Sequence, residues 1–423
     1  MKPTGARVIA DLKELKALTS DERGGAQRVA WGPVWRKARE WFQMKLHHEF
    51  GIDTKTDGAA NLWATLPGTS KSTKSLVIGS HLDSVPSGGW LDGCLGVVAG
   101  LEVFRRAKAL KYPLTIHLVD WADEEGARFG RSLTGSAASA GTLDPHKELA
   151  HLVDRNGVKL PDALKDNGFS LDGMKTAKKY FDALDALAYL ELHIEQGPVL
   201  EAMKKPAGVV LGTMGVERYN LRFVGQAVQA AHSGAAPLHL RKDAFLAAAE
   251  FALATREISV RYSGKTPRTR VVATCGVVKV EPNFVTAVPG STEISIDLRA
   301  LDGKVLKKML KDSIAASKKA AKKHLVTVEW SPLLHITPRP FDETLMKFAR
   351  QSVKEVTGSA PELPSGPLHD AAEMAAVVPT AMVFAQSSPG ISHTRLEDTP
   401  LPALEKSIRA FLLTVDKTVA HFG

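Results

Sequence analysis

LVIGSHLDSVPSGGWLDGCLG, residues 76–96, is the stretch from which we interpret the rest of the chain. Its first residues, Leu76 to Ile78, are apolar and predict a short buried strand. Side chains of a strand alternate between two faces, so a strand that continues past this point puts His81 and Asp83 on one face. A carboxylate next to an imidazole fixes the tautomer of a metal-binding histidine. This spacing therefore favours a metal-binding His81 that is oriented by Asp83.

A third polar residue, Asp92, follows eleven residues after His81, where we expect a helix to begin near Cys94. The residues between them are rich in proline and glycine, which predicts a loop that folds Asp92 back toward His81. The alternative is an ordinary strand, loop and helix with a solvent-facing histidine and a capping aspartate. This stretch alone leaves both interpretations open.

Length and composition define the class of protein. A chain of 423 residues is longer than a single hydrophobic core usually accommodates, so we expect two domains. A hydrophobic content of 44% and a charged content of 24% are typical of a globular protein in water. No apolar run approaches the ~18 to 20 residues of a membrane span, and the first residues lack the apolar segment of a secretory signal. We therefore expect a cytoplasmic protein with no membrane partner.

The two cysteines, Cys94 and Cys275, lie far apart in the sequence. They form neither a disulfide framework nor a thiolate metal cluster, which also fits a reducing compartment. Any metal ion must therefore be bound by histidines and carboxylates.

The formal net charge of +9 raises the question of nucleic-acid binding. Much of the positive charge lies in residues 301–324, where Leu306, Leu310 and Ile314 predict an apolar helix face and lysines occupy the other faces. The chain lacks the interleaved aromatic residues and the fold signature of nucleic-acid-binding proteins. We therefore expect no nucleic-acid partner and interpret the lysines as a solvated face, which could also draw anionic substrates toward a cleft.

Two adjacent acids, Glu124 and Glu125, follow a predicted buried strand at residues 114–119. Adjacent acids are common on protein surfaces, and a solvated pair is the simpler interpretation. However, α/β sheets present functional groups where their strands end. One of the two glutamates could bind a metal while the other moves protons.

Two more histidines lie near the ends of predicted strands. Residues 188–196, AYLELHIEQ, alternate between apolar and polar side chains and place His193 near the end of a strand. A single histidine on a strand is more often structural than metal-binding. His393 lies in the loop after a predicted strand at residues 381–385. Residues 142–183 are polar and loosely helical, and we assign them no role.

A separate unit begins near residue 212, and its elements are predicted in the order strand, helix, two strands, helix and strand. This order matches a ferredoxin-like fold. If the metal-binding candidates form one site, the unit is inserted between His193 and His393. We therefore expect a discontinuous catalytic domain at 1–211 and 332–423, with an inserted domain at 212–331.

Several stretches resemble the dinuclear-metal amidohydrolases related to aminoacylase and carboxypeptidase. They are GSHLDSVPSGGWLDGCLGVVAGLEV, ADEEGARFGRSLTGSAASAG, ELHIEQGPVLE, HSGAAPLHLRKDA, SGPLHDA and GISHT. HIEQGPVLE is specific to the branch of allantoate amidohydrolase, N-carbamoyl-L-amino-acid hydrolase and the microbial β-ureidopropionases. The resemblance implies an α/β fold in which a mixed-sheet, metallo-exopeptidase-like catalytic domain carries an inserted ferredoxin-like α+β dimerisation domain, or lid.

The resemblance also implies two metal ions per subunit. One is bound by His81, Asp92 and His193, and the second by Asp92, Glu125 and His393. Asp92 then bridges the two ions, Glu124 is the general base that takes a proton from the attacking water, and Asp83 orients His81. Zn²⁺ is the first choice for such ligands, and Mn²⁺, Co²⁺ or Ni²⁺ also fit them.

The same pattern assigns the substrate carboxylate to Arg299, with Asn283 and Gln196 nearby. His232 matches a histidine that reaches into the active site of the partner subunit and stabilises the oxyanion, so the active site requires a homodimer formed through the inserted domain. In GQAVQAAH, however, His232 lies three residues further from the preceding glycine than in relatives. The loop SGPLHDA also differs from the SGAGHDA of relatives, and we interpret its His369 as structural rather than as a substrate contact.

The implied function is hydrolysis of a linear amide or ureido C–N bond in a small molecule. The first candidate substrate is an N-carbamoyl amino acid, allantoate or N-carbamoyl-β-alanine, cleaved to amino acid, CO₂ and ammonia. Within the superfamily, the alternative is an aminoacylase or dipeptidase that acts on N-acyl amino acids or short peptides. A non-catalytic, metal-dependent binding protein is the alternative from a different class. Glu124 argues against it, because a protein that only binds has no use for a base beside its metals.

Overall fold

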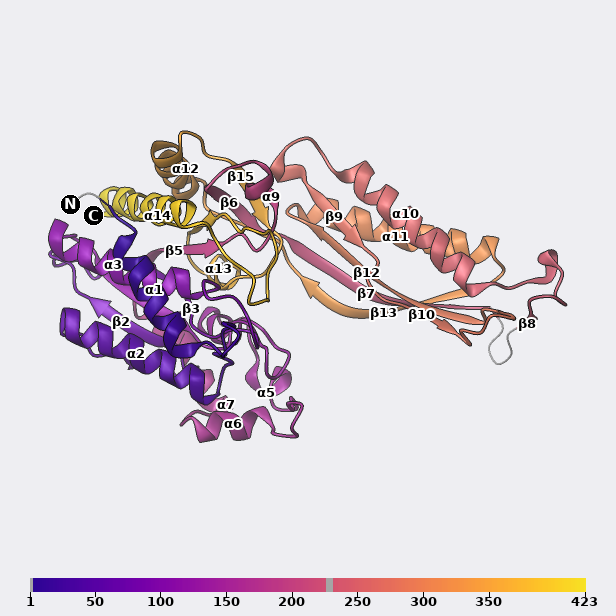
Figure 1. The fold of residues 1–423 in the computed structure, drawn as a ribbon, viewed down its shortest axis with the longest axis horizontal. Helices are drawn as coiled ribbons and strands as arrows, with labels where there is room; N and C mark the ends of the chain where they lie inside the picture. Colours follow the sequence, from indigo (N-terminus) through magenta and orange to yellow (C-terminus); the bar gives the residue numbers. More distant parts are fainter. Residues whose placement is uncertain (1–2, 226–230) are drawn as a thin grey trace. The chain divides into compact units, whose positions relative to one another are not determined.

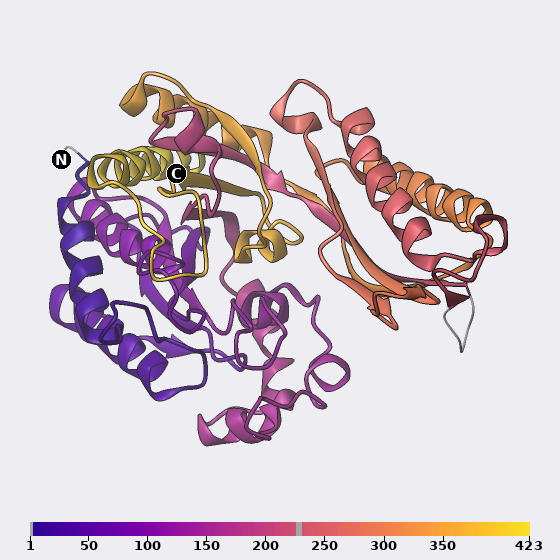
Figure 2. The ribbon, with the colours of Figure 1, turned by 45° about the vertical axis from the view of Figure 1, so that its right-hand side comes forward.

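The computed structural model describes residues 3–225 and 231–423. The chain divides into two compact units, the first made of Met1–Leu211 and Phe341–Gly423 and the second of Gly212–Pro340 (Figures 1 and 2). The return to the first unit was expected at residue 332, but this position lies inside strand β13 (Thr327–Ile336). β13 continues past Pro332 through an irregularity in its register. It can contain a proline because it lies at the edge of its sheet, where a missing N–H is tolerated.

The first unit is built on a mixed sheet. Among the described residues its strand order is β1-β2-β4-β3-β5-β16-β6, with β15 paired to β6. The bounds are β1 Lys55–Thr56, β2 Leu62–Leu66, β3 Ser75–His81, β4 Thr115–Trp121, β5 Ala186–Ile194, β6 Ala207–Thr213, β15 Glu362–Ser365 and β16 Thr380–Ala385. β14 (Arg339–Pro340) pairs with the last residues of β6, where the chain passes from one unit to the other. β6 has no predicted counterpart in the sequence.

Four central strands, β4, β3, β5 and β16, run parallel to one another. His81 of β3 is level with Trp121 of β4, and Ile78 of β3 is level with Leu190 of β5. His81 and His193 each lie three residues beyond this last pair, and their ring centroids are 5.8 Å apart. The carboxyl ends of parallel strands meet at one edge of the sheet, which is where α/β proteins place their sites.

Helices cover this sheet, and α3 contacts β3, β4 and β5 while α14 contacts β5 and β16. The bounds are α1 Ala6–Thr19, α2 Pro33–Phe50, α3 Cys94–Leu110, α4 Thr134–Ala140, α5 Pro145–Glu148, α6 Leu160–Asp166, α7 Leu171–Met174, α8 Ala177–Asp182, α9 Val199–Ala202, α12 Glu343–Thr357, α13 Asp370–Met374 and α14 Leu401–Phe422. α3 begins at the predicted Cys94. Residues 142–183 form short helices around apolar side chains such as Leu149, Leu164 and Met174. Their helical character was predicted.

A buried ion pair holds α2 against β4 and the residue that follows β3. Arg39 donates from Nε to Oδ2 of Asp120 at 2.6 Å and from Nη1 to the carbonyl oxygen of Ala60. The other carboxylate oxygen of Asp120 accepts the backbone N–H of Leu82, the residue between His81 and Asp83. Asp120 is fully buried. Its carboxylate therefore connects α2 to the end of β3.

We expect Arg39→Ala to lower the free energy of unfolding by about 3 to 5 kcal/mol, because it leaves the buried Asp120 carboxylate without its partner. Urea unfolding followed by circular dichroism measures the change. Arg36→Ala is the matched control, because Arg36 lies on the same helix with an exposed side chain. Equal stabilities of the two variants would contradict the structural importance of this ion pair.

The second unit contains an antiparallel sheet covered by two helices. In the described part of the chain the strand order is β10-β12-β7-β13, with β9 also paired to β12, and β8 pairs with β11 in a separate two-stranded ladder. The bounds are β7 Gly215–Val224, β8 Ala231–His232, α10 Ala244–Tyr262, β9 Val271–Thr274, β10 Val278–Glu281, β11 Ala287–Val288, β12 Ser291–Ala300 and α11 Gly303–Lys323. Single 3-10 turns lie at Leu238–Leu240 and Pro267–Thr269. Both predicted helices and the first and last predicted strands are present, but the described chain has four strands, β9 to β12, between α10 and α11 where two were predicted, and β8 was not predicted.

α10 and α11 pack on one face of this sheet around a buried apolar cluster that includes Phe223, Phe251 and Leu306. The lysines of α11 face outward, as the sequence predicted, and most of them are exposed. Within the described residues, no helix is both long and apolar enough to cross a lipid bilayer.

Candidate metal centre

Histidines and carboxylates of the first unit converge at the carboxyl ends of its parallel strands. His81 is the last residue of β3, and His193 is the last but one of β5. Glu124 and Glu125 follow the end of β4, and Asp92 lies two residues before α3. His393 comes from the loop between β16 and α14. The predicted metal-binding residues of this unit therefore lie at one edge of the sheet.

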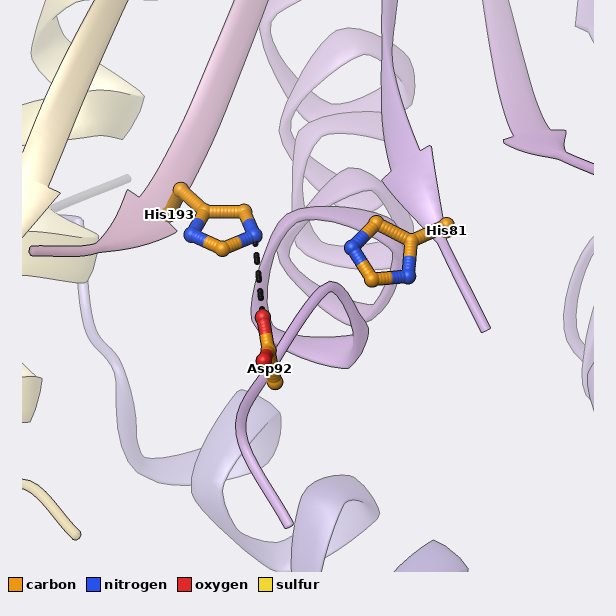
Figure 3. Close-up of side chains that lie close together, drawn as sticks. All are labelled: His81, Asp92 and His193. Carbon is orange, nitrogen blue, oxygen red and sulfur yellow. Dashed lines mark ion pairs between the residues drawn. The ribbon is translucent and has the colours of Figure 1, made fainter. Parts of the chain in front are cut away.

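The first group consists of His81, Asp92 and His193, whose potential ligand atoms all lie within 4.8 Å of one another. Figure 3 shows the two imidazoles and the carboxylate pointing toward a common space. His193 Nε2 lies 3.3 Å from Asp92 Oδ1. All three side chains are buried. Their arrangement suits a single cation.

Backbone carbonyls fix the tautomers of both buried histidines. His81 Nδ1 lies 3.2 Å from the carbonyl oxygen of Asp83, and His193 Nδ1 lies 2.9 Å from that of Ile194. A carbonyl oxygen only accepts, so each Nδ1 is the donor, and in the neutral imidazole Nε2 then carries the lone pair that can bind a metal. Burial also lowers the pKa of His193 to about 4, which keeps its imidazole neutral.

The second group consists of Asp92, Glu125 and His393, again with potential ligand atoms within 4.8 Å. His393 Nε2 lies 3.4 Å from Glu125 Oε2 and 3.9 Å from Asp92 Oδ2. Asp92 therefore faces His193 with one oxygen and His393 with the other. The two oxygens of Asp92 could therefore each bind a different cation.

A third possible group, Glu191, His193 and His369, shares His193 with the first. His193 has one nitrogen lone pair to offer, so the first and third groups exclude each other. Both oxygens of Glu191 already accept hydrogen bonds, Oε1 from Ser80 and Oε2 from Tyr189 and the Ala371 N–H. The first group is therefore the better cation site. His369 is buried, and its ring centroid lies 4.3 Å from that of His193.

The charges and the donors of the site fit divalent cations. Burial raises the pKa of Glu124 well above its usual value, and burial together with the nearby Asp92 does the same for Glu125. Cations would offset the cost of keeping these carboxylates ionised and close together. His193 Nε2 is buried and has no hydrogen-bond partner among the described residues, as expected of a metal ligand.

Glu124 is 7% exposed, and its Oε2 lies 3.6 Å from His81 Nε2. It belongs to none of the three possible cation groups of the described residues. A carboxylate beside a cation pair that is not itself a ligand is free to accept a proton. The family resemblance implies that this residue is the general base.

Asp83 contacts both His81 and the turn that carries Glu124 and Glu125. Its Oδ1 lies 3.6 Å from His81 Nδ1, further away than the backbone carbonyl oxygen of the same residue. Its two carboxylate oxygens accept the backbone N–H groups of Glu124 and Glu125 at 3.2 and 3.1 Å. Asp83 therefore also holds the turn that carries both glutamates, and no periodic pattern in the sequence indicates this.

Gln196, expected to contact substrate, lies next to the carboxylate of Asp92. Its Nε2 donates to Asp92 Oδ2 at 3.0 Å and lies 2.9 Å from the hydroxyl oxygen of Ser392. Ser392 in turn donates to Glu397 Oε2. Burial raises the pKa of Glu397 to about 8. Sequence reasoning missed Ser392 and Glu397, and the only signal is a glutamate four residues after His393.

The other predicted substrate residues, His232, Asn283 and Arg299, belong to the second unit. His232 and Asn283 are exposed. Arg299 donates from Nε to Asp297 Oδ1 at 2.7 Å. The insertion expected before His232 lies largely in residues 226–230, outside the described residues.

The fold and the site together define an α/β protein with a candidate metal centre at the ends of parallel strands. Residues 77–417 match the model of peptidase family M20/M25/M40, and the chain belongs to this family. It is 33% identical to the N-carbamoyl-L-amino acid amidohydrolase of Geobacillus stearothermophilus over 93% of each chain. It is 30% identical to the allantoate amidohydrolase of Bacillus subtilis, over 92% of this chain and 91% of that protein. A hydantoinase/carbamoylase family amidase from Burkholderia ambifaria has a similar structure, with a TM-score of 0.85 and 30% identity over 98% of this chain and 97% of its own.

Proposed function

We propose that this protein is a metal-dependent hydrolase of linear C–N bonds other than peptide bonds, and that it cleaves N-carbamoyl amino acids, allantoate or N-carbamoyl-β-alanine. The names of its relatives support this substrate class. The observation that carries the proposal is the pair of cation groups that share Asp92, with Glu124 beside them.

His81, Asp92 and His193 would hold one ion, and Asp92, Glu125 and His393 the other. Two bound divalent ions supply Lewis acidity, because they polarise the scissile carbonyl and lower the pKa of water. The His and carboxylate donors favour Zn²⁺, with Mn²⁺, Co²⁺ or Ni²⁺ as substitutes. Metal-bound protein analysed by elemental analysis identifies the resident ion.

Glu124 would take one proton from the attacking water as the water oxygen bonds to the ureido carbon. The C–N bond to the amino group of the product then breaks, and Glu124 returns the proton to that nitrogen. The other product is a carbamate, which decomposes to CO₂ and ammonia. Burial raises the pKa of Glu124, which makes its carboxylate a stronger proton acceptor than an exposed one.

Arg299 would bind the substrate carboxylate, because a guanidinium can donate two parallel hydrogen bonds to it. Asp297 orients Arg299 through its Oδ1 atom, and it is itself held by Arg218 at 2.6 Å. Asn283, Gln196 and His232 would complete the substrate site, with His232 at the oxyanion.

The distances within the second unit support a homodimer. Arg299 lies eight residues after Ser291 on β12, about 26 Å along the strand. Asn283 lies beyond the other end of β12, because Glu281 pairs with Ser291, and His232 pairs with the same loop at Ala287. A substrate the size of an amino acid does not span this distance. Contact of all three residues with one substrate therefore requires a second copy of the chain, so the ferredoxin-like second unit would serve as dimerisation domain and lid, and the first unit as catalytic domain.

The protein would work in the cytoplasm. Cys94 and Cys275 are both free, which fits the reducing cytoplasm that the composition predicted.

The test is a substrate panel assayed after metal removal by a chelator and again after metal addition. We expect no turnover of N-carbamoyl amino acids, N-carbamoyl-β-alanine or allantoate without metal, and recovery with Zn²⁺ or Mn²⁺. Each ureido substrate is paired with its N-acyl analogue as a control. Faster cleavage of the acyl analogues would make the protein an aminoacylase. Metal-dependent binding of all substrates without cleavage would make it a binding protein.

A further inference from the structure

The three histidines of the centre are held in different ways. His81 and His193 are fixed through their rings, because each Nδ1 donates to a backbone carbonyl. Among the described residues, no hydrogen-bond acceptor faces Nδ1 of His393. The His393 side chain is 55% exposed, and its backbone has a positive φ of 56°. The loop backbone must therefore decide where the His393 imidazole lies.

Glu397 closes this loop around His393. The Glu397 side chain is 1% exposed, and its Oε2 accepts both the Ser392 hydroxyl at 2.7 Å and the backbone N–H of His393 at 3.2 Å. A positive φ is unfavourable for a residue with a side chain, so it persists only when surrounding contacts enforce it. One oxygen atom of Glu397 supplies two of these contacts.

The same oxygen is connected to the bridging carboxylate. Ser392 donates to Glu397 and accepts a hydrogen bond from Gln196, whose Nε2 also donates to Asp92 Oδ2. This chain of hydrogen bonds runs from Asp92 to the backbone of His393. It connects two members of the second cation group through atoms that bind no cation.

Contacts on the other side of Glu397 set its position. Its Oε1 lies against Gly89, where a Cβ atom would be only 1.9 Å away. The neighbouring Trp90 donates from Nε1 to Asp398 Oδ1 at 3.0 Å. The segment just before Asp92 is therefore packed on the segment just after His393. This contact explains how residues about three hundred positions apart meet at the second cation group.

We propose that Glu397 is a positioning residue that places His393 for the second metal ion. The length of its side chain, rather than its charge, is what this role requires. Both donors bind the same oxygen, so a neutral amide oxygen at that position would serve as well. A shorter carboxylate would keep the charge but would not reach the His393 N–H. This inference rests on the proposed dinuclear function and assigns a role to a residue that binds neither ion.

The test uses the full chain, freed of metal with a chelator and titrated with Mn²⁺ in a calorimeter. For Glu397→Asp we expect the second ion to bind at least about 10-fold more weakly, as for other residues that orient ligands, with the first ion within about 3-fold of wild type. For Glu397→Gln we expect both affinities within about 3-fold of wild type. Excess Mn²⁺ should restore the turnover of Glu397→Asp. Glu355→Asp, a shortening of an exposed glutamate on α12, is the matched control.

Two results would overturn the proposal: wild-type binding of the second ion by Glu397→Asp, or loss of the second ion in Glu397→Gln. If Glu397→Asp is unfolded by circular dichroism, Ser392→Ala replaces it, because it removes one donor to Glu397 and the link to Gln196. Ser392→Ala is then expected to bind the second ion several-fold more weakly, and an unchanged affinity for that ion overturns the proposal.

A wild-type chain that binds fewer than two ions contradicts the proposed dinuclear function as well. Two ions in wild type with an unaffected Glu397→Asp contradict only the role of Glu397.

Discussion

Replacement of Asp92 by alanine is expected to remove both metal ions and to reduce turnover by about 1000-fold or more. Asp92 faces His193 with Oδ1 and His393 with Oδ2, so one substitution removes a ligand from each cation group. The estimate follows because bound cations contribute several kcal/mol to stabilising the transition state, and about 1.4 kcal/mol corresponds to a factor of ten in rate. Elemental analysis of the dialysed protein and a ureidase assay measure the two effects.

Loss of metal must be separated from loss of fold. Asp92 adds to the repulsion that raises the pKa of Glu125, so its removal does not increase the charge repulsion in the metal-free protein. We therefore expect metal-free Asp92→Ala to melt within a few degrees of metal-free wild type, while added metal raises the melting temperature of wild type alone. Asp172→Ala, at an exposed position on α7, is the control. Two ions per chain in Asp92→Ala would contradict the bridging role.

Glu124→Gln is expected to bind both ions like wild type and to lose about 100-fold to 10,000-fold in kcat, the range for general acid–base catalysis. Glutamine has the shape of glutamate but no oxygen that accepts a proton at neutral pH. Glu124 belongs to none of the possible cation groups among the described residues, so the metal content should not change. Calorimetric metal titration and steady-state kinetics on the same preparation measure both quantities.

Two outcomes of the Glu124→Gln experiment would contradict this role. Undiminished kcat would remove Glu124 as the base, and loss of one ion would make it a metal ligand instead. Glu355→Gln controls for the substitution itself at an exposed position. In addition, KM should change much less than kcat, because Glu124 is expected to act on water rather than on the bound substrate.

Local features of the chain were predictable because they depend on neighbouring residues. The apolar run before His81 predicts β3, and Cys94 begins α3 as expected. The charged and apolar faces of α11 follow from a period of 3.6 residues. The family resemblance then selected the histidines and carboxylates that the structure brings together at the sheet edge.

Interactions between distant segments were not predictable. Glu397 is an ordinary glutamate in the sequence, and its role depends on Ser392, Gln196 and Gly89, which leave no periodic signal. The continuation of β13 past Pro332 was missed for a related reason, because a proline ends a strand or not according to whether its N–H side is paired. Whether a strand lies at an edge depends on the order of strands in the sheet, which the local sequence does not specify.

The sequence by itself determined which residue types stand where strands end, and therefore that histidines and carboxylates are available to bind metal. Only the tertiary structure decided that they meet. The parallel pairing of β3 with β5 brings the rings of His81 and His193 to within 5.8 Å of each other, and the loop after β16 carries His393 to the side of Asp92. The physical reason is that the order of residues along a chain does not specify which strands become neighbours. That choice is made by the packing of the whole sheet.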